Sequence, residues 1–121
     1  GKLKKPMKTN DFLKQLKKVM QTDCIRFTKL NKEYIEIVAV CGGSGSFLLD
    51  DAKKVKADIF ITADFKYHEF FDAEDNIIIA DIGHYESEQF TKELICEILK
   101  KKFTKFATHL SSINTNPINY M

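Results

Sequence analysis

A histidine and a glutamate four residues apart, His84 and Glu88, have the types and spacing that metal binding needs. They follow a short apolar run, residues 77–80, which predicts a buried strand, and a turn at Gly83. On a helix, positions i and i+4 lie on one face, with Cβ atoms roughly 5–6 Å apart. An imidazole and a carboxylate held in this way can bind one metal ion. The carboxyl ends of strands are also where ligands bind in open α/β sheets.

Structural interpretations of the same two residues stay open. Glu88 lies near the start of the expected helix, where a carboxylate offsets the helix dipole. His84 could satisfy a local backbone group. Short motifs also match by chance, so spacing alone leaves the metal hypothesis and the structural one side by side.

A second acid and histidine stand at the end of the preceding strand. Asp64 follows that strand, and His68 lies one helical turn further along. Two acids and two histidines at neighbouring strand ends could start a metal or acid–base site. Taken alone, His68 would be a hydrogen-bonded structural histidine and Asp64 a helix cap. If both strand ends face one cleft, the residues that converge there are Thr62, Asp64, His68, His84 and Glu88.

A glycine-rich segment, residues 42–46, lies between an expected strand and an expected helix. The backbone N–H groups of Gly43, Ser44 and Gly45 could cradle an anion. The segment is not a Walker A loop, because no Gly-Lys-Ser/Thr follows. It also fails the dinucleotide fingerprint, since Leu48 stands where the third glycine belongs. A tight turn that brings the helix close to the strand accounts for the glycines equally well.

The elements that must position these residues alternate between helix and strand. Thr9 is the expected N-cap of a helix that ends near Gln21. Strands at 25–28 and 34–41 are expected to pair as an antiparallel hairpin at a sheet edge. The remaining expected elements are a helix at 47–55, a strand at 58–62, a short helix at 66–73, a strand at 77–82, one long helix to about 103, a last strand at 106–110 and a polar tail at 111–121. This order predicts an α/β fold with a mixed, mostly parallel sheet flanked by helices.

Composition narrows the class of protein. The chain has 121 residues, of which 44% are hydrophobic, as expected for a single α/β domain over 1–121. A net charge of +2 is too small to favour nucleic acid as a partner. Three widely spaced cysteines argue for a reducing, cytoplasmic compartment and against a disulfide framework. No apolar run has the length of a membrane span, and nothing resembles a signal peptide.

Four motifs in order resemble the C-terminal part of the Nif-three-like proteins, often named GTP cyclohydrolase I type-two homologues. The motifs are residues 38–45 (Val-Ala-Val-Cys-Gly-Gly-Ser-Gly), 61–68 (Ile-Thr-Ala-Asp-Phe-Lys-Tyr-His), 81–88 (Asp-Ile-Gly-His-Tyr-Glu-Ser-Glu) and 114–117 (Asn-Thr-Asn-Pro). The Gly-His-Tyr-x-x-Glu block is the most specific. One departure is Ala63, which stands where the family usually has glycine.

The resemblance implies a centre of two divalent metal ions, to which His84 and Glu88 would contribute. Zinc, iron and manganese are all compatible with such ligands. It also implies that His68 lines the same cavity as a catalytic or substrate-facing residue. The family's other ligands come from an N-terminal His-His-Pro-type motif and an acidic residue. This chain has no such motif, so it resembles the C-terminal part of a longer chain that forms ring-like homo-oligomers.

The function that follows from the resemblance is metal-dependent hydrolysis of a nucleotide or another phosphorylated small molecule. These 121 residues alone are expected to be inactive, because half of the ligands are missing. The alternative is a non-catalytic protein that binds or delivers metal, or that regulates a partner.

Overall fold

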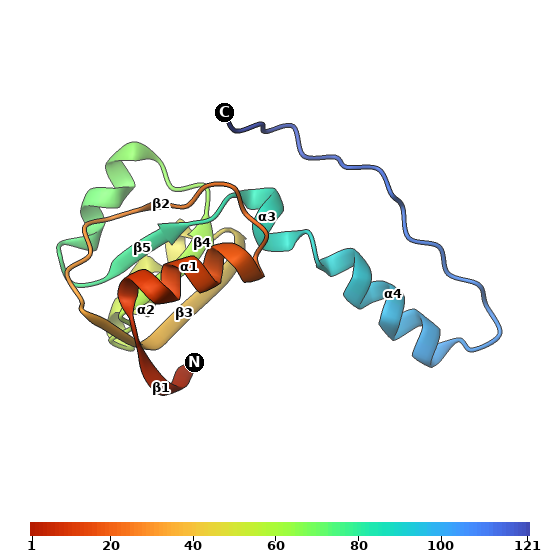
Figure 1. Ribbon diagram of the computed structural model, residues 1–121, viewed down its shortest axis with the longest axis horizontal. Coiled ribbons are helices and arrows are strands. Elements are labelled where there is room, and N and C mark those ends of the chain that lie inside the picture. Colours follow the sequence, from red (N-terminus) through yellow and green to blue (C-terminus); the bar gives the residue numbers. More distant parts are fainter.

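The computed structural model describes all 121 residues, and a five-stranded mixed sheet forms its centre (Figure 1). The strand order is β1-β3-β4-β5-β2. β3 (Tyr34–Ser44), β4 (Ile59–Ala63) and β5 (Ile78–Asp81) run parallel. β1 (Lys2–Lys8) and β2 (Arg26–Phe27) are antiparallel strands at the two edges. The predicted mixed α/β sheet is therefore confirmed.

Helices cover both faces of this sheet (Figure 1). The helical elements are α1 (Thr9–Val19), η1 (Ser46–Leu48), α2 (Leu49–Lys54), η2 (Tyr67–Ala73), α3 (His84–Glu88) and α4 (Thr91–Lys102), of which η1 and η2 are 3-10 helices. On one face Ile59 and Ile78 pack against Leu13 of α1. On the other face Phe60 packs with Ala52 of α2. Successive strand residues point to opposite faces, so β4 and β5, which are apolar except for Thr62 and Asp81, are buried on both sides.

The predicted hairpin between residues 25–28 and 34–41 is wrong. β2 pairs with β5 at one edge of the sheet, with Arg26 opposite Asp81. β3 pairs antiparallel with β1, which the N-terminal lysine-rich residues form, at the other edge. Pro6 is tolerated there because an edge strand leaves some N–H groups unpaired in any case. Both antiparallel pairs thus join segments that are distant in the sequence. The short polar segment between the two expected strands suggested a hairpin and gave no sign of these pairings.

The first helix begins slightly differently from the prediction. Lys8, not Thr9, occupies the N-cap position, and no side chain caps the helix there. Thr9 is the first helical residue and is buried. Its hydroxyl donates a 2.5 Å hydrogen bond to the Lys32 carbonyl oxygen, so this threonine joins the helix to the chain before β3.

The C-terminal quarter departs most from the prediction. The single long helix is interrupted at residues 89–90, between α3 and α4, where the Gln89 side chain donates a hydrogen bond to the Met20 carbonyl oxygen. The last strand expected at 106–110 does not form. α4 carries the chain away from the sheet, so this segment has no strand edge to pair with (Figure 1). Residues 103–121 run back toward α3 without regular structure. No helix is both long and apolar enough to cross a membrane.

Candidate functional site

The turn from β5 into α3 positions both predicted metal ligands. Gly83 has φ +91°, and a Cβ built on it would lie 2.2 Å from Glu86 Oε2, so only glycine fits. α3 starts directly after this glycine, at His84. One turn later Glu88 lies on the same side, with Oε2 3.4 Å from His84 Nε2. Both side chains are about half exposed, at 53% and 52%, and are accessible to a ligand.

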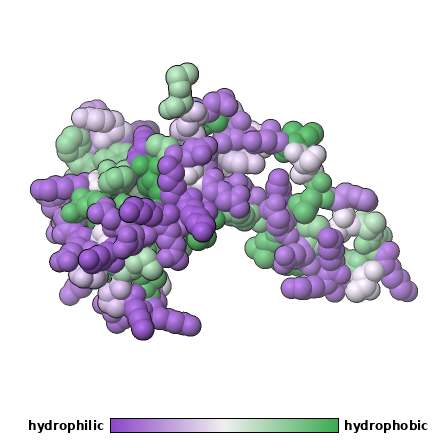
Figure 2. Space-filling view, in the orientation of Figure 1, coloured by the Kyte–Doolittle hydropathy of each residue, from purple (hydrophilic) through white to green (hydrophobic).

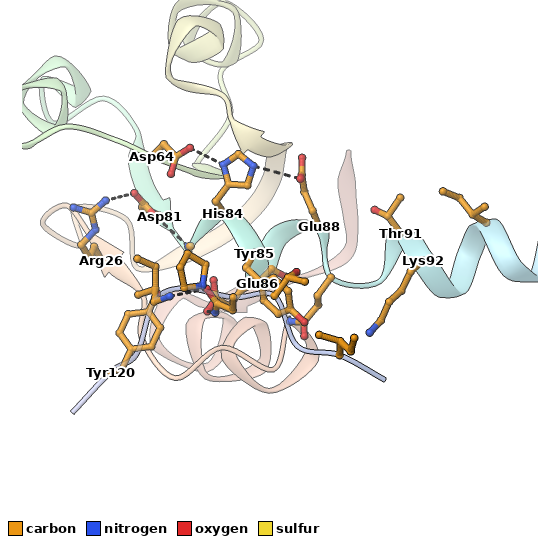
Figure 3. A pocket seen from close by; sticks show the side chains of 18 residues that line it. Arg26, Asp64, Asp81, His84, Tyr85, Glu86, Glu88, Thr91, Lys92 and Tyr120 are labelled. Carbon is orange, nitrogen blue, oxygen red and sulfur yellow. Dashed lines mark hydrogen bonds and ion pairs between the residues drawn. The ribbon is translucent and has the colours of Figure 1, made fainter. Parts of the chain in front are cut away.

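Asp64 lies on the other side of His84 and completes a line of three side chains (Figure 3). Its carboxylate Oδ2 is 2.6 Å from His84 Nδ1 and also accepts a hydrogen bond from the Ser44 hydroxyl. The hydrogen bond from Ser44, followed by that from His84, lowers the pKa of Asp64 below its usual value. The hydrogen bond to Asp64 raises the pKa of His84. This imidazole therefore stands between two carboxylates, an arrangement that favours positive charge.

The glycine-rich segment forms the wall behind these side chains. β3 continues to Ser44, so the predicted loop is partly strand. Gly43 has φ +63°, and a Cβ there would lie 2.7 Å from Glu88 Oε1. Its N–H donates a 2.8 Å hydrogen bond to Ser87 Oγ, and its carbonyl oxygen accepts one from Thr62. This N–H is thus engaged within the protein, and the adjacent carboxylate favours a cation over an anion.

Gly45, the last residue of the predicted anion cradle, shows the same close packing. A Cβ at this position would lie 2.3 Å from Thr62 Oγ1 and 2.8 Å from Cys41 Cβ. The glycines at 43 and 45 therefore let the end of β3 approach α3 and β4 closely. Of the five residues expected to converge, the structure brings Asp64, His84 and Glu88 together, with Thr62 directly behind them.

His68 lies outside this group. It belongs to η2 and is exposed, and its ring contacts the Tyr67 ring edge-on, with centroids 5.3 Å apart. It does not line the cavity that contains His84. A role for His68 toward a substrate stays a prediction.

A cavity of about 930 Å³ adjoins the three side chains (Figure 3). Asp64, His84 and Glu88 line one part of it. Another part carries the ion pair between Arg26 and the buried Asp81. Sequence reasoning missed these last two residues as part of a site, because they lie 55 positions apart and share no motif.

The C-terminal tail covers the same cavity. Asn116 Nδ2 donates a 3.1 Å hydrogen bond to Oε1 of Glu86, a buried carboxylate in α3. Tyr120 lies beside it, and burial, followed by the Glu86 charge, raises the pKa of Tyr120. The Asn-Thr-Asn-Pro motif at 114–117 was the one sequence signal for this part of the cavity. Nothing in the sequence indicated that it would meet α3.

The donor set fits one side of a metal site. No group of three or more His, Cys, Asp or Glu side chains is arranged to hold a metal ion. For the pair, an ion roughly 2.1 Å from each donor at a tetrahedral angle would separate the donors by about 3.4 Å. His84 Nε2 and Glu88 Oε2 stand 3.4 Å apart. Asp64 corresponds to the carboxylate that usually orients a metal-binding histidine through its other nitrogen. The remaining ligands would have to come from outside these residues.

Comparisons with known proteins all point to one family. A sequence model described as Duf34/NIF3 (NGG1p interacting factor 3) matches residues 1–117. Two similar proteins, both named GTP cyclohydrolase 1 type 2 homolog, come from Staphylococcus epidermidis and Campylobacter jejuni. They are 36% identical over 125 residues and 33% identical over 106 residues. The matches cover 99% and 87% of this chain but only 34% and 42% of the relatives. The chain thus spans about a third to two-fifths of their length.

Solved structures agree with the sequence match. The crystal structure of a Staphylococcus aureus protein superposes with a TM-score of 0.83 at 27% identity, covering 99% of this chain and 40% of that one. A Bacillus cereus protein related to NIF3 gives a TM-score of 0.82 at 26% identity, covering 100% of this chain and 35% of that one. With a family match over all but residues 118–121, this chain belongs to the Duf34/NIF3 family, as its four motifs predicted.

Proposed function

We propose that His84 and Glu88 form one side of a divalent-metal centre, and that the completed centre belongs to a metal-dependent hydrolase. The observation that carries the proposal is the 3.4 Å separation of their donor atoms, with the Asp64 carboxylate behind the histidine. The relatives' name, GTP cyclohydrolase 1 type 2 homolog, supports a nucleotide or another phosphorylated small molecule as substrate.

The residues of this chain have separable roles in such a site. A bound divalent ion would supply Lewis acidity and a water of lowered pKa. Asp64 holds His84 through Nδ1, which directs Nε2 toward Glu88. The 930 Å³ cavity has room for a small molecule beside the two ligands. His68 is proposed as a substrate-facing residue, and its position in η2 requires a substrate that extends beyond this cavity.

The first test is metal content. The chain is purified without chelators beside a His84→Ala/Glu88→Ala variant, and bound zinc, iron and manganese are measured by mass spectrometry. A control, His109→Ala/Glu97→Ala, removes the same residue types from exposed positions outside the site. We expect the first variant to carry at least about tenfold less bound metal than the parent chain. The control should keep the parent level. Equal metal in all three proteins contradicts the ligand assignment.

The second test is turnover. A chimera is built in which this chain replaces the matching region of the Staphylococcus epidermidis relative, so that the rest of the longer protein is present. It is assayed on nucleotide and phosphoester panels after metal loading. Turnover that is lost with His84→Ala supports a hydrolase. Metal binding without turnover of any compound favours the alternative, a protein that stores or delivers metal. The half-exposed side chains of His84 and Glu88 would also suit release of a metal ion.

A further inference from the structure

Arg26 is the only arginine of the chain, among 19 lysine and arginine residues in total. It lies on β2, opposite Asp81 of β5, and its side chain lines the cavity that contains His84 and Glu88. Figure 3 shows it beside Asp81, on the Asp64 side of His84. The Arg26 side chain is 55% exposed, so its guanidinium is open to a molecule that enters this cavity.

Three groups of the protein hold this guanidinium in place. Its Nη2 pairs with Asp81 Oδ2 and donates a 3.0 Å hydrogen bond to the carbonyl oxygen of Phe65, the residue after Asp64. The Phe70 ring lies under the guanidinium, with its centroid 5.4 Å from Cζ. A cation at this distance is attracted to the face of an aromatic ring. Arg26 is thus fixed beside the turn that carries Asp64, and it loses little freedom when a ligand binds.

The other donors of the Arg26 guanidinium are unused. Neither Nη1 nor Nε donates a hydrogen bond within the chain, since both hydrogen bonds of this side chain come from Nη2. Asp81 needs no further donor, because it also accepts hydrogen bonds from the backbone N–H groups of Phe65 and Gly83, each at 3.0 Å. An entering molecule therefore meets N–H donors at this end of the cavity and must supply acceptors.

A phosphate group suits these donors. It presents three strong acceptor oxygens, and its hydrogen bonds to a guanidinium are charge-assisted and roughly twice as strong as those between neutral groups. Lys92 of α4 adds a second permanent positive charge to the cavity lining. The carboxylates that line the same cavity each contact a polar partner within the chain already: Asp64, Asp81, Glu86 and Glu88.

We propose that Arg26 binds the phosphate group of an organic phosphate, through the donors that it does not use for Asp81 and Phe65. The inference rests on the proposed function and deepens it, because it assigns the phosphate of the substrate to the Arg26 end of the cavity. Arg26 is then a residue that determines specificity, since a molecule without a phosphate leaves its donors unpaired. The binding of the phosphate itself requires no metal.

The single arginine makes a chemical test specific. Phenylglyoxal, which modifies arginine side chains, is added to the metal-free chain in EDTA, and the peptide that contains Arg26 is followed by mass spectrometry. Glycerol 3-phosphate is the probe, and glycerol in sodium chloride of equal ionic strength is its control. With a dissociation constant of about 5 mM, the probe at about 20 mM should slow the modification about fivefold. Equal rates with the probe and with glycerol would overturn the proposal.

A titration identifies the donor to the phosphate. The amide signals of Phe65 and Gly83, which both donate to Asp81, are followed by NMR as glycerol 3-phosphate is added to the metal-free chain and to two variants. Arg26→Lys keeps a positive charge beside Asp81, but one ammonium has fewer donors left for a ligand, so the dissociation constant should rise at least about fivefold. Lys29→Gln, at a basic residue outside this cavity, should leave the constant unchanged. The same constant in Arg26→Lys and in the parent would overturn the assignment.

The source of the phosphate and the role of the metal are tested separately. Protection of Arg26 by inorganic phosphate but not by glycerol 3-phosphate would also overturn the proposal, because the site would then recognise the free ion. Binding of glycerol 3-phosphate by a chain that binds no metal leaves this inference standing and counts against the proposed metal centre. Metal bound through His84 and Glu88 without binding of the probe at Arg26 does the reverse.

Discussion

Asp64 is the residue on which the orientation of His84 depends. It sits in the left-handed region, with φ +61°, and links the ends of β3, β4 and α3 through Ser44 and His84. Apart from glycine, Asn is among the residues that tolerate this backbone conformation best, and it lacks the charge. Asp64→Asn should therefore keep the fold but weaken zinc binding about 10- to 100-fold, as expected when the carboxylate behind a metal-binding histidine is lost. Competition with a fluorescent chelator measures the affinity, and Asp72→Asn, an exposed acid of η2, is the control. Unchanged affinity would show that Asp64 has no part in the site.

Gly42 and Gly43 are adjacent, but only Gly43 has a backbone conformation and a close contact that require glycine. Gly43 has φ +63°, and a Cβ there would press on Glu88 Oε1 at 2.7 Å. At Gly42 a Cβ would meet its nearest atom, Glu88 Cγ, at an ordinary 3.6 Å, and φ is not positive. Gly43→Ala should lower the free energy of unfolding by about 1–3 kcal/mol. Gly42→Ala should change it by less than about 0.5 kcal/mol. Urea unfolding of both variants checks this pair, and similar losses would contradict the close-packing account of the glycines.

Among the elements, those buried on both faces could be predicted from sequence, and those held by distant partners could not. The strands expected at 58–62 and 77–82 match β4 and β5, because apolar side chains fill both faces. β1 and β2 depend on edges supplied by other segments, and the expected strand at 106–110 has no edge within reach. Within the candidate site, the i, i+4 spacing of His84 and Glu88 predicted that the two side chains would lie on one side of a helix, and they do. Asp64 was noted for its spacing to His68, yet its hydrogen bond goes to His84.

A side-chain hydrogen bond joins the C-terminal tail to α3. The Asn116 amide is the hydrogen-bond donor to the buried Glu86 carboxylate, across 30 positions of sequence. Asn116→Ala removes that donor and should cost about 1 kcal/mol, which corresponds to roughly a fivefold larger open population of the tail. Limited proteolysis within residues 113–121 should accelerate by a similar factor. Asn119→Ala, a nearby asparagine of the same tail, should leave the cleavage rate at the parent value.

At the scale of the whole molecule, the free energy of local opening should differ between the central sheet and the projecting helix α4. β4 and β5 lie in the centre of the sheet with both faces packed, whereas α4 buries little besides Cys96. In the 121-residue chain, α4 should therefore open without unfolding of the sheet. Backbone amides of β4 and β5 should exchange with deuterium at least roughly 1000-fold more slowly than those of α4, because they open only when the body unfolds.

The amides of β4 and β5 provide the internal control for this exchange experiment, because those strands are buried within the sheet. If the amides of α4 exchanged as slowly as those of β5, the helix would be held as firmly as the sheet. That result would contradict a separate opening of α4, since the helix would then open only when the whole molecule unfolds.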